Sequence, residues 1–153
     1  MAKRKIRWDE RLGAAECARR VLPGLAKSFF EEVRSFLSSK RAPAQFHRMR
    51  LAAKRLRYIL ELFEPCYGPG LKQRLDVLKS LQDSLGDLTD VVATRRLLAK
   101  TVDAEVEQFL DRRAAELAGE FREQWRETFD AEGRLEWWTH YLRESSRPPS
   151  EKK

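Results

Sequence analysis

The chain has 153 residues, of which 42% are hydrophobic and 36% are charged, and its formal net charge is +7. This length is enough to bury a core as one domain. No run approaches the ~20 apolar residues of a membrane-spanning helix, and no apolar secretion segment follows the basic N-terminus. Cys17 and Cys66 are too few for a disulfide framework. We therefore expect a cytoplasmic protein.

The composition favours helices. Leu, Ala, Glu, Arg and Lys dominate, and the hydrophobic residues recur at helical rather than strand spacing. We predict an all-α fold, an antiparallel bundle of long helices. We expect a basic N-terminal tail over residues 1–8, a helical domain over 9–144 and a polar C-terminal tail over 145–153.

Proline and glycine residues mark the boundaries of the first three predicted helices. The first helix runs over about residues 9–37, and Pro23-Gly24 predicts a kink or a break inside it. Pro43 suits the first position of a second helix over about 44–64. A third helix is predicted over about 70–85, with Gly86 as its C-cap.

A longer helix is predicted from Leu88 to about residue 130, with a bend or break near residues 101–103. Asp87 or Thr89 can cap its start, and Asp103 can act as a second N-cap after the bend. A short aromatic helix with two tryptophans follows Gly133. The buried side predicted for the long helix includes Leu97, Val106 and Phe109.

Basic residues are concentrated in two stretches of the chain. Residues 40–57 contain seven Lys or Arg and no acid, and residues 1–7 contain four more. Outside these stretches the chain has 20 basic and 24 acidic residues, so the remainder is net acidic. This local basicity indicates a polyanionic partner such as nucleic acid, anionic lipid or a phosphate polymer.

The second predicted helix separates apolar from cationic side chains at about 100° per residue. Its apolar face comprises Met49, Ala52, Ala53, Leu56, Ile59, Leu60 and Phe63. The opposite face carries His47, Arg50, Lys54, Arg57 and Tyr58, and Arg48 and Arg55 lie on one flank. Acids that would pair with these cations four residues along are missing until Glu61. An uncompensated row of cations can follow a repeating phosphate chain.

The sequence shows no catalytic or metal-binding pattern. His47 and His140 lie far apart in the chain, and there is no HExxH, CxxC or GxxxxGK[ST] motif. Asp83, Asp87 and Asp90 are spaced for helix capping and ion pairing rather than for a metal site. We therefore expect a protein that is not an enzyme, needs no cofactor and holds no metal.

Two stretches of the chain resemble a known family. Residues 47–63, HRMRLAAKRLRYILELF, are similar to the HxxRVxxRRLRxxLxxF signature of the CHAD family, the conserved histidine α-helical domain. Residues 78–90, LKSLQDSLGDLTD, are similar to the LxxLQxxLGxLxD segment that follows in that family. The resemblance covers about residues 10–100 well.

The resemblance implies a helical-bundle domain that binds inorganic polyphosphate through a basic surface and is found at polyphosphate granules. Carried over residue by residue, the polyphosphate-binding set is His47, Arg48, Arg50, Lys54, Arg55, Arg57 and Lys79. The supporting residues are Tyr58, Gln82, Asp83, Asp87 and Asp90. The last four are expected to position the basic side chains and to cap helices.

One departure from the family pattern predicts an oligomer. Members of the family usually carry the histidine motif twice, in two helical halves that enclose a basic pore, whereas this chain has one copy. We expect a half-unit completed by homodimerisation, in which each chain of a two-fold pair supplies one basic helix. The Trp-rich C-terminal segment would then pack against the second chain.

Alternatives to polyphosphate binding stay open at this point. A nucleic-acid-binding helical protein would have the same charge, but Tyr58 is the one stacking aromatic beside the basic row. A phosphohydrolase or phosphotransfer enzyme would use His47. An interaction scaffold would present the basic face to an acidic protein. We expect polyphosphate and a second copy of the chain as partners, and no membrane.

Overall fold

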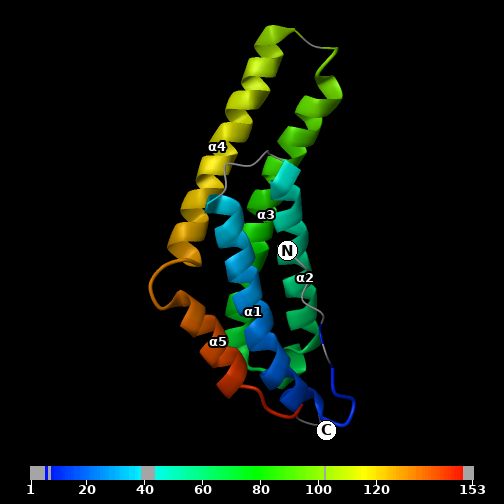
Figure 1. Ribbon diagram of the computed structural model, residues 1–153, viewed down its shortest axis with the longest axis vertical. Helices are drawn as coiled ribbons and strands as arrows, with labels where there is room; N and C mark the ends of the chain where they lie inside the picture. The colour runs from blue at the N-terminus through cyan, green and yellow to red at the C-terminus, as the bar shows by residue number, and fades with distance from the viewer. Residues whose placement is uncertain (1–5, 7, 39–43, 102, 150–153) are drawn as a thin grey trace.

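The computed structural model describes residues 6, 8–38, 44–101 and 103–149, and these form a helical bundle with no strand among them (Figure 1). Pro43 and the four basic residues of the predicted N-terminal tail, Lys3, Arg4, Lys5 and Arg7, lie outside the described residues. The all-α prediction is confirmed. The elements are α1 (Ala14–Ser38), α2 (Ala44–Leu62), a 3₁₀ turn η1 (Glu64–Cys66), α3 (Pro69–Leu98), α4 (Ala104–Thr128) and α5 (Arg134–Glu144).

Helix α3 is the longest helix and organises the bundle. It contacts α2 on one side and α4 on the other, while α1 contacts α5 and α2. Helices α2 and α3 run in opposite directions and are joined by η1 (Figure 1). The two motif stretches found in the sequence therefore lie side by side, one on each helix of this antiparallel pair.

The predicted end of the third helix at Gly86 is wrong, because α3 continues through Gly86 to Leu98. Neither Asp87 nor Thr89 is therefore an N-cap. Gly86 is buried inside the helix and has no left-handed backbone conformation. A glycine ends a helix only where neighbouring contacts do not hold the next turn, and here Leu85 and Leu88 are both buried in the core. Packing against two neighbouring helices outweighs the low helix propensity of one glycine.

The predicted break near residues 101–103 is confirmed. Helix α3 ends at Leu98 and α4 begins at Ala104, with Asp103 as its N-cap. The Asp103 carboxylate accepts a hydrogen bond of 3.0 Å from the backbone N–H of Val106. This bond satisfies one of the free N–H groups at the start of α4.

The burial predicted for Leu97, Val106 and Phe109 is wrong. Their exposed fractions are 82%, 38% and 58%. They lie in an arm formed by residues 89–98 of α3 and 104–116 of α4, in which no described residue is fully buried. The arm extends past the other helices (Figure 1). No third helix of the described chain therefore covers the apolar side of its two helices.

Pro23 does not break the first helix. Helix α1 is continuous from Ala14 to Ser38 with Pro23 inside it, and it begins later than the predicted residue 9. Proline removes one backbone hydrogen bond from the helix interior. The buried residues around it, Leu22 and Ala26, pack into the core on the same side and hold the two halves of α1 in one helix.

The core is rich in aromatic rings contributed by α1, α4 and α5. Phe30 of α1 is fully buried and lies 5.3 Å from the Trp125 ring and 6.3 Å from the Trp138 ring, measured between centroids. Trp138 also stacks on Phe129 at 5.8 Å. The Trp-rich C-terminal segment therefore packs within its own chain, which corrects the expectation that it meets a second one.

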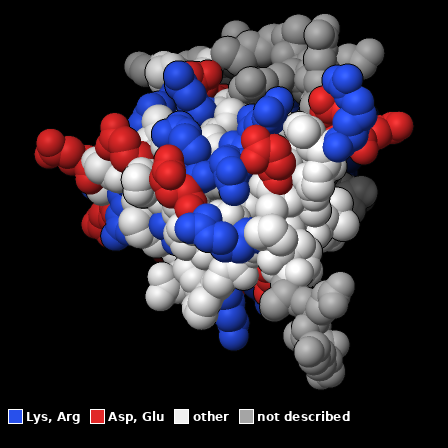
Figure 2. All heavy atoms as spheres, turned by 90° about the horizontal axis from the view of Figure 1, so that it is seen from below, with Lys and Arg blue, Asp and Glu red and all other residues white. Residues whose placement is uncertain are grey.

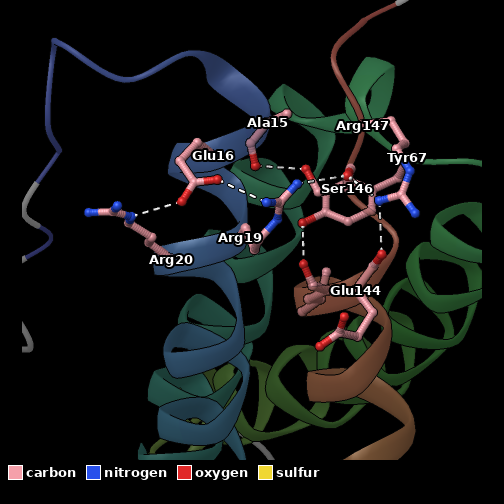
Figure 3. Close-up of polar contacts among 9 residues, drawn as sticks. Ala15, Glu16, Arg19, Arg20, Tyr67, Glu144, Ser146 and Arg147 are labelled. Atoms are coloured by element: carbon pink, nitrogen blue, oxygen red, sulfur yellow. Dashed lines mark hydrogen bonds and ion pairs between the residues drawn. The ribbon is translucent and has the colours of Figure 1, made fainter.

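The C-terminal segment after α5 lies at the lower end of the bundle (Figure 1) and is held there by hydrogen bonds (Figure 3). Ser146 is fully buried, and its hydroxyl donates a 2.7 Å hydrogen bond to the carbonyl of Ala15. The backbone N–H of Arg147 donates to the carbonyl of Cys66 at 2.8 Å. The hydroxyl of Tyr67 donates to the carbonyl of Leu142 at 2.7 Å. These bonds hold α1, η1 and α5 together at one end.

Candidate polyanion-binding site

Helix α2 presents the cationic face that the sequence predicts. Met49, Ala53, Leu56 and Leu60 are buried in the core, as expected of its apolar side. The side chains of His47, Arg48, Lys54, Arg55 and Tyr58 are exposed, whereas Arg50 and Arg57 are half-buried. The helix thus stabilises itself through one side and leaves its cations accessible on the other.

The cations of α2 form two rows on different sides of its exposed surface. Arg50 and Arg57 are seven residues apart, and with Lys54 and His47 they form an inner row toward α3. Arg48 and Arg55 are also seven residues apart and form an outer row away from α3. Seven residues correspond to about 10 Å along a helix. The predicted binding set is therefore not one continuous line.

Arg50 fixes the position of the inner row relative to α3. A Cβ atom built on Gly86 would lie 3.6 Å from Nε and 3.7 Å from Nη2 of Arg50, so the guanidinium lies against the backbone of α3. Because α2 and α3 are antiparallel, the residue seven after Arg50 and the residue seven before Gly86 lie at about the same height. Arg57 and the exposed Lys79 therefore lie at about the same height on the adjoining sides of the two helices, along the line where α2 packs on α3.

Most of these cations have no counter-charge. Within the described residues, Arg48, Arg50, Lys54 and Arg55 make no ion pair, while Arg57 pairs with Glu61 at 3.2 Å. Unpaired like charges on neighbouring turns of a helix repel one another. An anion bound along the row would relieve this repulsion.

Tyr58 lies between two of the cations. Its ring centroid is 5.6 Å from Nζ of Lys54 and 5.2 Å from Cζ of Arg57, within the range of a cation–π contact. Because Tyr58 is 47% exposed, these contacts hold the two side chains near the surface of α2 without covering them.

Helix α3 places polar residues beside the same line of contact. The side chain of Gln82 is half-buried, and its Oε1 has no hydrogen-bond partner among the described residues. Asp83, Asp87 and Asp90 are exposed, and in the described part of the chain their carboxylates pair with no basic side chain. Their role in positioning the cations stays a prediction. The capping role predicted for Asp87 is wrong, because α3 is continuous through this residue.

A second group of cations, at the lower end of the bundle, differs from the face of α2. Figure 2 shows Lys and Arg side chains on this end with Asp and Glu side chains among them. Arg19 and Arg20 both pair with Glu16 at 3.0 Å. The guanidinium of Arg147 donates to the carbonyls of Glu144 and Ser146 at 2.9 and 2.7 Å (Figure 3). These cations already have partners, so α2 is the better candidate for binding a polyanion.

The environment of Arg74 could not be predicted from the sequence. This residue is 4% exposed, and its Cζ lies 3.6 Å from the ring centroid of Trp137 and 3.9 Å from that of Tyr141. Its guanidinium donates to the carbonyls of Gly70 and Trp137 at 2.8 and 2.6 Å. Burial lowers the pKa of Arg74 to about 10. Arg74 therefore joins α3 to α5 and is not available to a ligand.

Metal sites and membrane spans are both absent from the described residues. No group of three or more His, Cys, Asp or Glu side chains within them could hold a metal ion. None of the described helices is both long enough and apolar enough to cross a membrane.

The fold and the site define an all-α bundle protein with an uncompensated cationic helix on its surface. The family model described as the CHAD domain matches residues 3–99, and the chain belongs to the CHAD family. The matched region contains α1, α2 and α3, and thus both motif stretches and the contact between α2 and α3. No curated protein and no solved structure matches the chain in the corresponding searches.

Proposed function

We propose that the protein binds inorganic polyphosphate along the surface where α2 packs on α3, and that it does so without catalysing a reaction on it. CHAD domains are known to bind polyphosphate. The observation that carries the proposal is the inner row itself, in which Arg50 and Lys54 have no counter-charge among the described residues. Of the predicted binding set, His47, Arg50, Lys54, Arg57 and Lys79 form this site, whereas Arg48 and Arg55 lie on the other side of α2 and are left out of it.

The chemistry of these side chains suits a phosphate chain. The guanidinium groups of Arg50 and Arg57 can each donate two hydrogen bonds to phosphate oxygens, and Lys54 supplies a mobile charge between them. Arg50 is already placed by its contact with Gly86, so less conformational entropy is lost on binding. By analogy with nucleic acids, bound counterions are released and affinity falls steeply as salt rises.

The proposed absence of catalysis rests on the surroundings of His47. Its side chain is exposed on α2, and no hydrogen bond or ion pair to another described side chain orients it. A general base or nucleophile needs a partner that fixes its orientation and protonation. In this proposal His47 contributes a contact at the end of the cation row.

We further propose that the protein acts as a homodimer in the cytoplasm, at polyphosphate granules. The cation row of a single chain is short. Two chains that each contribute one row would present a longer basic surface. Multivalent contact of this kind increases affinity without any new type of interaction.

A competition titration tests the function. Labelled long-chain polyphosphate is bound to the full chain at fixed ionic strength and displaced with unlabelled polyphosphate or with single-stranded nucleic acid of matched charge. We expect polyphosphate to compete better. A preference for DNA or RNA would contradict the proposal. Release of orthophosphate in the presence of divalent metal would contradict its non-enzymatic part.

A further inference from the structure

The outer side of α2 combines positive charge with exposed apolar surface. Leu51, Tyr58 and Leu62 are 51%, 47% and 76% exposed and follow one line along the helix. Arg48 and Arg55 lie beside that line, and neither makes an ion pair among the described residues. A phosphate chain would satisfy the cations but would leave the leucines in water. This surface therefore fits a ligand that is both acidic and apolar.

The outer side of α4 has the opposite character. Five exposed glutamates recur at helical spacing along it: Glu105, Glu116, Glu120, Glu123 and Glu127. Phe109, which is 58% exposed, lies on the same line. Of these five, Glu116 alone has an ion pair within the described residues, to Arg113 at 3.2 Å. The other four have none, like Arg48 and Arg55 on α2. The exposed Arg112 lies on the same side of α4, so five glutamates outnumber one arginine there and the side is net negative.

These two surfaces cannot meet within one chain, because α3 lies between α2 and α4 (Figure 1). They can meet between two chains. Contact between two α2 surfaces would bring Arg48 and Arg55 toward like charges, and contact between two α4 surfaces would do the same for the glutamates. Opposite charge selects the unlike pair.

We propose that the outer side of α2 docks on the acidic outer side of α4 of a second copy of this chain. Because α2 and α4 lie on opposite sides of α3, the contact joins two copies head to tail, and the α2 of one copy and the α4 of the other stay open for further copies. Leu51, Tyr58 and Leu62 lose exposed apolar surface, and the unpaired charges of both helices gain partners. The inner row of α2 remains free for polyphosphate. This inference specifies the contact between copies of the chain and does not depend on polyphosphate binding.

The test is a charge exchange on the full chain, followed by mass measurement in solution without polyphosphate. One variant is Arg48→Glu/Arg55→Glu and the other is Glu120→Lys/Glu127→Lys, so each reverses two charges seven residues apart. The control is Lys27→Glu/Lys72→Glu, on α1 and α3, which changes the net charge by the same amount as the first variant and breaks no ion pair among the described residues. All six positions are exposed, and circular dichroism checks the fold of each protein.

The wild-type and control proteins should have at least twice the 18.0 kDa mass of the chain. Each charge-reversal variant alone should remain at 18.0 kDa. An equimolar mixture of the two variants should return to the wild-type mass, because each α2–α4 contact between the two variants again joins opposite charges. A monomeric wild type, an unaffected variant, or a mixture that stays monomeric would overturn the proposal. Since no polyphosphate is present, failure here leaves the proposed ligand untouched.

Discussion

Arg50 of α2 lies against Gly86 of α3, and this contact joins the two motif stretches of the chain. The nearest atoms of the guanidinium would be 3.6–3.7 Å from a Cβ at position 86, which is ordinary van der Waals distance. The glycine therefore leaves the guanidinium room to lie along α3. A residue that looked like a helix end in the sequence instead helps to place a candidate ligand-binding side chain.

Substitutions of Gly86 should separate helix stability from the position of Arg50. Gly86→Ala adds a methyl group that fits, and it should raise the free energy of unfolding by about 0.5–1 kcal/mol through better helix propensity. Gly86→Leu should displace the Arg50 guanidinium and lower polyphosphate affinity as much as Arg50→Ala does. Urea unfolding and titration measure the two effects. Wild-type affinity in Gly86→Leu would show that Arg50 needs no such placement.

Ser146 should contribute to stability although it follows the last helix. Ser146→Ala removes the buried 2.7 Å hydrogen bond to the carbonyl of Ala15 and should lower the free energy of unfolding by about 1 kcal/mol. Ser145→Ala is the matched control, because the Ser145 hydroxyl makes no hydrogen bond among the described residues. Equal urea midpoints for the two variants would contradict the role given to Ser146.

Arg74 should not tolerate lysine even though the charge is kept. A lysine cannot stack between Trp137 and Tyr141 and donate to both backbone carbonyls at once. We expect Arg74→Lys to lower the free energy of unfolding by about 2–3 kcal/mol. Arg134→Lys is the control, since Arg134 is exposed and lies farther from the Trp137 ring, at 5.2 Å. An Arg74→Lys midpoint close to that of Arg134→Lys would be inconsistent with this account.

The contribution of Tyr67 to the free energy of unfolding should decrease as the pH rises through the alkaline range. Burial raises the pKa of Tyr67 from 10.0 to about 12. Between these values the unfolded chain loses the phenolic proton while the folded chain keeps it, so rising pH favours unfolding. Tyr67→Phe should be less stable at about pH 9, where it lacks the bond to Leu142, but should lose less stability by about pH 11.5. Parallel slopes for the two proteins in urea unfolding would contradict the assignment. The lowered pKa of Arg74 acts with the opposite sign, but it is common to both proteins and cancels in the comparison.

Hydrophobic periodicity predicts the helices and the faces of α2 but not which neighbours those helices have. Met49, Ala53, Leu56 and Leu60 were expected in the core and are buried there. The same reasoning fails for Leu97, because periodicity identifies an apolar side without showing whether another helix reaches it. The helix end predicted at Gly86 is wrong for a related reason. Helix α3 continues past Gly86 because it packs on α2 and α4, which are distant in sequence.

The candidate site could be predicted in part. The absence of acids between residues 40 and 57 is visible in the sequence, and the exposed cations of α2 agree with it. The direction of the inner row toward α3 is not visible, since it depends on the packing of Arg50 on Gly86. The buried Arg74 and Ser146 have no sequence signal, because an arginine and a serine are normally surface residues.

The most direct test of the central claim compares two charge-reversal variants in a polyphosphate titration at fixed salt. One is Arg50→Glu/Lys54→Glu/Arg57→Glu, in the inner row, and the other is the Arg48→Glu/Arg55→Glu variant of the outer row. If polyphosphate binds where α2 packs on α3, the affinity of the triple variant should fall by about 100-fold or more, because each lost contact costs roughly 1–1.5 kcal/mol. The outer-row variant should lose much less. Binding by the triple variant at wild-type affinity would contradict the account.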